Sequence, residues 1–205
     1  MKKFFKGVMH SGDFRTSRLE AFSDGVFAIV ITLLVLELRV PEVEGPHVSE
    51  ELIRGLIVLL PKFISFVVSF IYIAIYWVNH HQLFHVLKKS DRGLFWLNSL
   101  FLLFLTFIPF PTALIGSYPC EPVAVIVYGV AMFFTGVSFI IMKEYMFASE
   151  LVDPTRARRT PIFYIIAGPS LYVLAVFLAT LNVKFAIAIY LLIPVIYFFA
   201  GKELN

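Results

Sequence analysis

Charge is scarce in this chain of 205 residues, because only 15% of them are Asp, Glu, Lys or Arg. An ordinary soluble domain is about a quarter charged and about half apolar, whereas 60% of this chain is hydrophobic. Cysteine is nearly absent too, since Cys120 is the only one. A single thiol excludes an internal disulfide and a cysteine-rich metal site. The composition leaves almost no room for a soluble domain.

The sequence also lacks the motifs of hydrolytic enzymes. It has no nucleophile elbow, no His-Glu-x-x-His and no pair of aspartates in facing apolar segments. His81 and His85 have a spacing that suits two metal ligands on one helix face, but no acidic residue stands at the right interval beside them. No apolar h-region precedes Asp13, so we expect no cleaved secretory signal. We therefore expect neither an enzyme nor a metal or cofactor site.

Long apolar blocks fill most of the chain instead. A helix needs about 20 residues to cross a hydrocarbon core about 30 Å thick, and six blocks approach or exceed that length. They predict an all-α polytopic membrane protein in which residues 1–205 form a single domain of six transmembrane helices. The predicted spans are approximately 17–39, 51–80, 92–116, 121–146, 160–181 and 183–200.

Prolines predict breaks in two of these spans. The second span is too long for one untilted crossing and contains Pro61, which removes a backbone hydrogen bond. The part before Pro61 is expected to protrude or to lie along the outer surface. The third span ends in Pro109-Phe110-Pro111-Thr112, which predicts a second break near the outer face.

The basic residues predict the orientation of the chain. Most of the 17 Lys and Arg residues fall before the first span, between spans two and three, between spans four and five, or after span six. The positive-inside rule then places both termini in the cytoplasm. The net charge of +3 is therefore a signal of topology rather than of nucleic-acid binding. We expect a multi-pass protein of the plasma membrane.

The entry of the first span carries ionisable residues. A central Asp or Arg in a membrane helix costs about 2.5–3.5 kcal/mol and usually faces protein or water. Ser23 and Asp24 are therefore expected to find polar partners at the same depth, which removes much of the penalty. The spacing does not decide which histidine takes part. The candidates for this cluster are Arg18, His80, His81, Trp96 and Asn98.

A stripe of four residues follows on the same span. Ile29, Thr32, Leu33 and Leu36 have the spacing of one helix face, and Asp24 projects about 140° away from that face. Packing against lipid or another helix would produce the same aliphatic pattern. The hydroxyl of the threonine also has a local alternative, a bond back to the carbonyl four residues earlier. The helix thus combines an apolar stripe with a separate polar anchor.

The segment Arg18-x-x-x-Phe22-Ser23-Asp24 resembles the signature of the transmembrane protein 175 family. These are potassium channels of bacteria and archaea, related to the endosomal and lysosomal channel of animals. The segments Trp77–His81 and Trp96–Thr112 are similar to that family as well. The resemblance covers residues 15–200 and implies one six-span repeat, with Arg18, Phe22, Ser23 and Asp24 in a structural role.

The resemblance implies a homotetramer in which the first span of each subunit lines a central pore. By position, Ile29 would be the first constriction, Leu33 and Leu36 further layers, and Thr32 a ring of hydroxyls. The family lacks the Thr-Val-Gly-Tyr-Gly filter, and none is present here. A ring of aliphatic side chains gates by dewetting. The implied function is a potassium-permeable cation channel with modest selectivity for potassium over sodium, in which potassium is the permeant ion.

Two alternatives to this function stay open at this point. One is a proton-permeable channel. The other is a secondary transporter of a small cation, because Pro61, Pro109, Pro169 and Pro194 are compatible with broken helices. We find no convincing internal repeat in the sequence, which weakens the second alternative.

Overall fold

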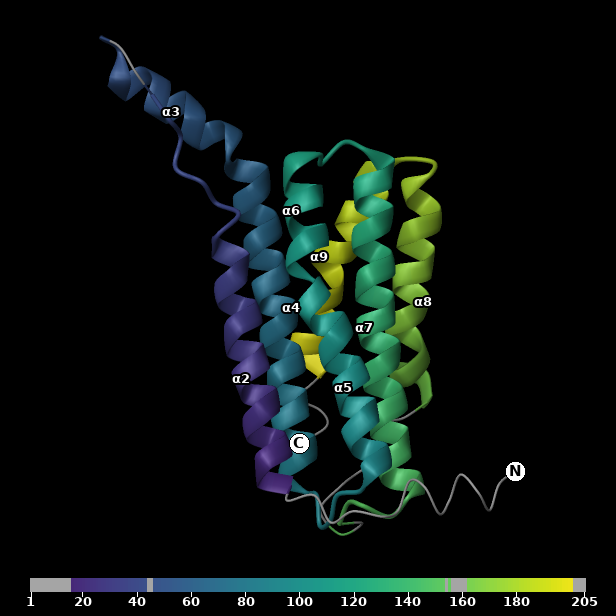
Figure 1. Ribbon diagram of the computed structural model, residues 1–205. Helices are drawn as coiled ribbons and strands as arrows, with labels where there is room; N and C mark the ends of the chain where they lie inside the picture. The colour runs from purple at the N-terminus through teal and green to yellow at the C-terminus, as the bar shows by residue number, and fades with distance from the viewer. Residues whose placement is uncertain (1–15, 44–45, 154, 156–161, 201–205) are drawn as a thin grey trace.

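The computed structural model describes residues 16–43, 46–153, 155 and 162–200. The regular secondary structure of these residues is helical, apart from one isolated bridge between Leu87 and Val152, and loops connect the helices. Most helices lie side by side along one direction, whereas α3 points away from them (Figure 1). The helices are α2 Thr16–Val35, α3 Val48–Val58, α4 Leu60–His85, α5 Arg92–Phe107, α6 Pro109–Ser117, α7 Pro122–Ala148, α8 Ile162–Ala179 and α9 Val183–Ala200.

Three helical segments in the described part of the chain are long and apolar enough to cross a membrane. They are Leu60–His85, Arg92–Ser117 and Pro122–Ala148. The apolar helices Ile166–Ala179 and Val183–Tyr197 are shorter. The 20-residue helix α2 has acidic and basic residues near its start. The basic residues at the two ends of the chain and at 156–159, which support the predicted orientation, lie outside the described residues.

Both helix breaks expected from the prolines are present. The predicted span 51–80 is divided into α3 and α4 at Leu59, and α4 continues to His85. The third predicted span is divided at Ile108, where α5 ends and α6 begins. Pro61 and Pro109 lie in the first turns of their helices, where the missing N–H of proline costs nothing.

Proline inside a helix is accommodated differently in α9. Pro194 lies in the interior of this helix and therefore cannot donate to the carbonyl four residues earlier, which belongs to Tyr190. The hydroxyl of Tyr72 on α4 donates to this carbonyl at 2.7 Å. Both tyrosines are buried, so a side chain of one helix replaces the backbone bond lost in another.

Close packing of α7, α8 and α9 depends on a glycine. A Cβ on Gly129 of α7 would lie 2.7 Å from Cγ2 of Val176 and would meet the hydroxyl of Tyr190. That hydroxyl donates to the carbonyl oxygen of Val125 at 3.1 Å. The absence of a side chain at Gly129 thus lets three helices approach one another.

The loops after α4 and α7 are joined beside the Leu87–Val152 bridge. Lys88 N donates to Leu151 O at 2.8 Å, and the amino group of Lys88 lies 3.4 Å from Oδ1 of Asp153. Hydrogen bonds from the hydroxyl and the backbone N–H of Thr155 hold the pKa of Asp153 below its ordinary value, and Lys88 adds to this effect. The two loops therefore connect the first half of the bundle to the second.

Candidate pore-lining site

Helix α2 has one buried and one exposed face. The buried face turns toward the bundle, and α2 lies at the edge of the bundle (Figure 1). The two faces alternate sharply, because Ile29 is 60% exposed whereas the adjacent Val30 is fully buried. The buried residues of this helix are Leu19, Ser23, Phe27, Val30 and Leu34.

The four residues of the predicted stripe all lie on the exposed side. Ile29, Thr32, Leu33 and Leu36 are exposed in the single subunit. The hydroxyl of Thr32 donates to the carbonyl of Ile29 at 2.8 Å. It therefore bonds within its own helix, but to the carbonyl three residues earlier and not to that of Ala28, four residues earlier. Leu36 lies one position beyond the end of α2, in a turn closed by its N–H on the carbonyl of Leu33 at 3.2 Å.

A chain of hydrogen bonds holds the opposite face of α2. Ser23 Oγ donates to the carbonyl of Leu19 at 2.9 Å and accepts from Nδ2 of Asn98 at 2.9 Å. Oδ1 of Asn98 then faces Nε2 of His80 at 2.9 Å. Because Oδ1 can only accept, Nε2 must carry the proton in this contact. The side chains of Ser23, Asn98 and His80 are fully buried, so α2, α4 and α5 are tied together by one polar chain.

Aromatic rings surround the histidine of this chain. The ring of Phe84 stacks on His80 at a centroid distance of 4.0 Å, and Phe101 stacks at 6.0 Å. Phe27 of α2 approaches the same imidazole edge-on at 5.5 Å. Nδ1 of His80 has no hydrogen-bond partner among the described residues. The imidazole therefore serves both as a hydrogen-bond donor and as part of the packed core.

Asp24 does not join this buried chain. The indole N–H of Trp77 on α4 donates to Oδ1 of Asp24 at 3.0 Å. Asp24 follows Ser23 by about 100° around the helix and so faces a different part of α4. The single cluster predicted from the sequence is therefore two separate contacts, because Ser23 and Asp24 point in directions about 100° apart.

The remaining candidates lie farther out. His81 Nδ1 lies 3.5 Å from Oε1 of Glu20, in a pair between α4 and α2 whose histidine is exposed and whose glutamate is half-buried. Arg18 and Trp96 are exposed, and Trp96 packs edge-on against Phe95. The structure thus separates the two histidines, since His80 faces the buried chain and its neighbour faces outward.

Two contact residues were missing from the predicted set. Trp77 precedes His80 by three positions, which places both on the side of α4 that meets α2. An indole N–H can only donate a hydrogen bond, and a carboxylate can only accept one. This complementarity was the feature of the sequence that indicated Trp77 as a partner of Asp24. The sequence indicated the contact of Glu20 with His81 less clearly, because an acidic residue at a helix start is commonly solvated.

Comparisons with known proteins agree with this arrangement of helices. Residues 18–109, which include most of α2, all of α4 and the Ser23–Asn98–His80 chain, match a family model described as the endosomal/lysosomal potassium channel TMEM175. A potassium channel of Chamaesiphon minutus is 36% identical over 184 residues, which are 85% of this chain and 89% of that relative. A potassium channel of Streptomyces collinus is 37% identical over 194 residues, covering 90% and 92%.

A solved structure and a human relative extend the comparison. The crystal structure of a lysosomal potassium-selective channel TMEM175 homolog from Chamaesiphon minutus superposes with a TM-score of 0.75 at 34% identity, and the match covers 90% of this chain and 97% of that one. The human endosomal/lysosomal proton channel TMEM175 is 34% identical over 110 residues, which are 51% of this chain but only 22% of the human protein.

The helices and these matches define the class as a multi-pass α-helical membrane protein of an ion-channel family, not an enzyme. More narrowly, the chain belongs to the TMEM175 family, because it covers most of the length of bacterial relatives at more than 30% identity.

Proposed function

We propose that this protein is a potassium-permeable cation channel of the plasma membrane, built from four copies of the chain around a central pore lined by α2. Six spans per subunit and cytoplasmic termini complete the proposed arrangement. The bacterial relatives are named potassium channels, which supports the choice of ion. The observation that carries the proposal is the stripe of α2, whose four side chains are exposed in the single subunit.

The proposed constriction is a ring of four Ile29 side chains. An aliphatic ring of this kind stops ions by excluding water and conducts when it widens. Potassium holds its hydration shell less tightly than sodium, so a narrow apolar ring favours potassium. The Thr32 hydroxyl, one turn farther along and exposed, is a suitable ligand for a partly dehydrated ion. Leu33 and Leu36 would form further apolar layers.

The buried face of α2 supports this role. A pore helix must present one face to water without separating from its subunit, and the Ser23–Asn98–His80 chain fixes α2 on the opposite side. The Trp77–Asp24 contact adds a second attachment. We assign Ser23 and Asp24 to holding α2 in place, and Ile29 and Thr32 to the ion path. Arg18 and Phe22, for which the resemblance implies the same structural role, are exposed in the single subunit.

The substitution Ile29→Asn tests the proposal. Polar side chains wet the ring, so we expect a higher basal potassium flux and a potassium-to-sodium permeability ratio that falls toward one. The measurement is bi-ionic planar-bilayer recording of purified protein. The matched control is Ile166→Asn on α8, because that isoleucine is 56% exposed, close to the 60% of Ile29, but lies outside α2.

An unchanged permeability ratio in Ile29→Asn would remove this residue from the constriction. A mass for the purified complex that does not correspond to four subunits would reject the central pore. The vertebrate relatives are named proton channels, so the purified protein is also reconstituted in liposomes, in which proton flux is assayed with a pH-sensitive dye and potassium flux is measured in parallel. Proton flux without potassium flux would favour the proton-permeable alternative, and saturable coupled uptake would favour a transporter.

A further inference from the structure

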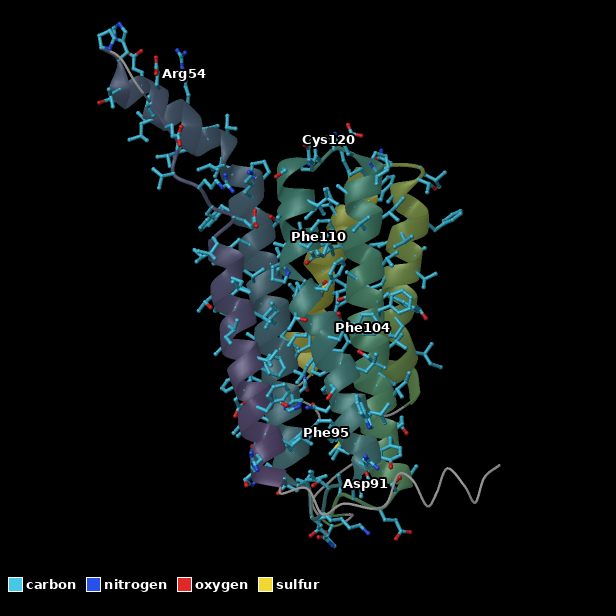
Figure 2. All side chains as sticks on the ribbon, in the orientation of Figure 1. Arg54, Asp91, Phe95, Phe104, Phe110 and Cys120 are labelled. Atoms are coloured by element: carbon cyan, nitrogen blue, oxygen red, sulfur yellow. The ribbon has the colours of Figure 1, made fainter. Side chains whose placement is uncertain are left out.

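The exposed face of α2 continues from Ile29 toward the start of the helix. Phe22 lies about 20° from Ile29 around the helix and about 10 Å before it along the axis. Arg18, one turn before Phe22, is also about 20° from Ile29. Both side chains are exposed in the single subunit, and Figure 2 shows side chains projecting from the free side of α2 along its length. One face therefore runs from the proposed constriction to the first turn of α2.

A second phenylalanine of α2 shows how a packing residue of this helix is placed. Phe27 is 1% exposed and contacts the rings of His80 and Phe101. It points about 160° away from Ile29, toward the bundle. Phe22, by contrast, is 55% exposed. The subunit uses one phenylalanine of α2 for its core and leaves the other one open.

Lipid does not account for the whole of this face. A surface that lies against acyl chains is apolar along its length, but Arg18 lies on this one, a turn before Phe22. Charged side chains of membrane helices usually face protein or water. In the proposed tetramer the face turns toward the central axis, so that water at the inner entrance reaches the guanidinium group and the phenyl ring follows on the ion path. This placement rests on the proposed function.

A glycine separates the phenylalanine from the constriction. Gly25 lies between the two along α2, about 40° from Ile29 around the helix. A Cβ built on Gly25 would meet nothing within 4 Å in the subunit, so the space at this level is open. Around the central axis, the path would widen at Gly25 between a ring of Phe22 side chains and the ring of Ile29. Such a chamber is suited to hold an ion before it enters the constriction.

The aromatic rings determine which ions this chamber favours. The face of a phenyl ring attracts a cation within about 6 Å of its centroid, and aromatic cages bind quaternary ammonium ions in this way. We propose that Phe22 and Gly25 form a cation site on the cytoplasmic side of the Ile29 constriction, which takes potassium and small quaternary ammonium ions. The charge of Arg18 at the entrance disfavours divalent cations, because Coulomb repulsion grows with the charge of the ion.

Block by tetraethylammonium tests the site. The ion is applied to the cytoplasmic side of excised inside-out patches, and the concentration that halves the potassium current is measured. We expect the block to strengthen when the cytoplasmic side is made positive, because the cation then moves into the membrane field.

Variants of the phenylalanine assign the block to its ring. Phe22→Leu should raise the half-blocking concentration by about fivefold or more, because the aromatic face is lost. Phe22→Tyr keeps that face and should change the concentration by less than about twofold. The matched control is Phe177→Leu on α8, since Phe177 is 61% exposed but lies outside α2. This control should leave the block unchanged.

Cysteine accessibility provides a measurement that does not depend on the blocker. The native thiol, exposed Cys120, lies at the end of the bundle opposite to the start of α2 (Figure 2) and is first replaced by serine. Phe22→Cys is then treated from the cytoplasmic side with a cationic, membrane-impermeant methanethiosulfonate reagent. We expect the potassium current to be lost, because a fixed positive charge is placed on the ion path. Phe177→Cys is the control and should keep its current.

Two results would overturn this inference while leaving the proposed function intact. One is the absence of cytoplasmic block, or equal half-blocking concentrations in the wild type and Phe22→Leu, in channels that conduct potassium. The other is a Phe22→Cys current that survives the reagent, because the side chain would then face lipid or a neighbouring subunit. Wild-type protein that carries no potassium current would reject both the inference and the proposed function.

Discussion

At the scale of single residues, the Ser23–Asn98–His80 chain gives each atom a fixed role. The hydroxyl of Ser23 donates to its own helix and accepts from the amide of Asn98. The orientation of that amide follows, and with it the proton on Nε2 of His80. Buried polar chains of this kind stabilise a unique packing only if their members are satisfied, and here Nδ1 of His80 is the buried side-chain atom of the chain that has no hydrogen-bond partner among the described residues.

Asn98→Ala should destabilise the subunit. The substitution removes the acceptor of the His80 N–H and the donor to Ser23 Oγ, both of which are buried. We expect a loss of about 1–3 kcal/mol in the free energy of unfolding, measured by chemical denaturation in detergent. Asn79→Ala is the control, because Asn79 is exposed and bonds only to Ile75 of its own helix. Equal losses in both variants would contradict a special role for Asn98.

The residues of this site could be predicted from the sequence only in part. The depth of Ser23 and Asn98 follows from their positions in the predicted spans, because rise per residue is fixed. The choice between His80 and His81 does not follow, since it depends on how α4 is rotated relative to α2. The Trp77–Asp24 contact was missed for the same reason. Rotation is set by the packing of large side chains such as Phe27 and Phe101, which spacing along one helix does not reveal.

At the scale of helices, Tyr72 of α4 and Pro194 of α9 form one unit. The proline leaves the carbonyl of Tyr190 without its backbone donor, and the hydroxyl of Tyr72 occupies that place at 2.7 Å. An unsatisfied carbonyl in a membrane helix is costly, and neighbouring side chains commonly satisfy it. The contact thus attaches the last helix of the described chain to the centre of the bundle.

A double-mutant cycle tests this unit. We expect Tyr72→Phe to reduce the free energy of unfolding by about 1 kcal/mol in the native background. The loss should be smaller in a Pro194→Ala background, because an alanine N–H can satisfy the carbonyl of Tyr190. Unfolding in detergent provides the measurement, and Tyr118→Phe at an exposed position is the control. Additive effects of the two substitutions would show that the residues act independently.

Helix boundaries were predictable where proline sets them. The breaks at Leu59 and Ile108 follow from Pro61 and Pro109, since covalent structure alone excludes a backbone bond there. The end of α2 at Val35 was not predictable in this way. Apolar residues continue past Val35 to Leu36, and Leu38 follows the single acidic residue Glu37, so no proline or glycine marks the point where the helix turns.

At the scale of the whole molecule, the proposed channel assigns different roles to the two halves of the chain. The family model matches residues 18–109, which contain α2 and the helices that anchor it. Helices α7, α8 and α9 pack on one another through the notch at Gly129. In the proposed channel the first half contains the ion path, and the second half supports it from outside.

The substitution Gly129→Ala tests whether the second half of the chain affects stability without affecting ion selectivity. The added methyl group collides with Tyr190 and Val176, and such overpacking costs about 1–3 kcal/mol. We expect a lower midpoint of thermal unfolding but an unchanged potassium-to-sodium permeability ratio in the channels that assemble. Gly25→Ala is the control for stability, because a Cβ at Gly25 meets nothing within 4 Å in the subunit. A changed permeability ratio in Gly129→Ala would contradict the division of roles.

The helical membrane architecture could be predicted from composition, because apolar blocks of this length have few alternatives. Assembly could not be derived in the same way. Lipid-facing and subunit-facing surfaces are both apolar in a membrane protein, so the exposed stripe of Ile29 looks the same in either setting. The tetramer was therefore implied by the resemblance to a family and stays a prediction here.

The ionisable residues of α2 have a consequence for biosynthesis. Asp24 and Glu20 find their partners, Trp77 and His81, on α4. A nascent α2 that leaves the translocon alone would carry the carboxylate of Asp24 into the bilayer without its indole partner, at a cost of about 2.5–3.5 kcal/mol. We expect this helix to remain at the translocation machinery until α4 has been synthesised, so that the two helices enter lipid as a pair.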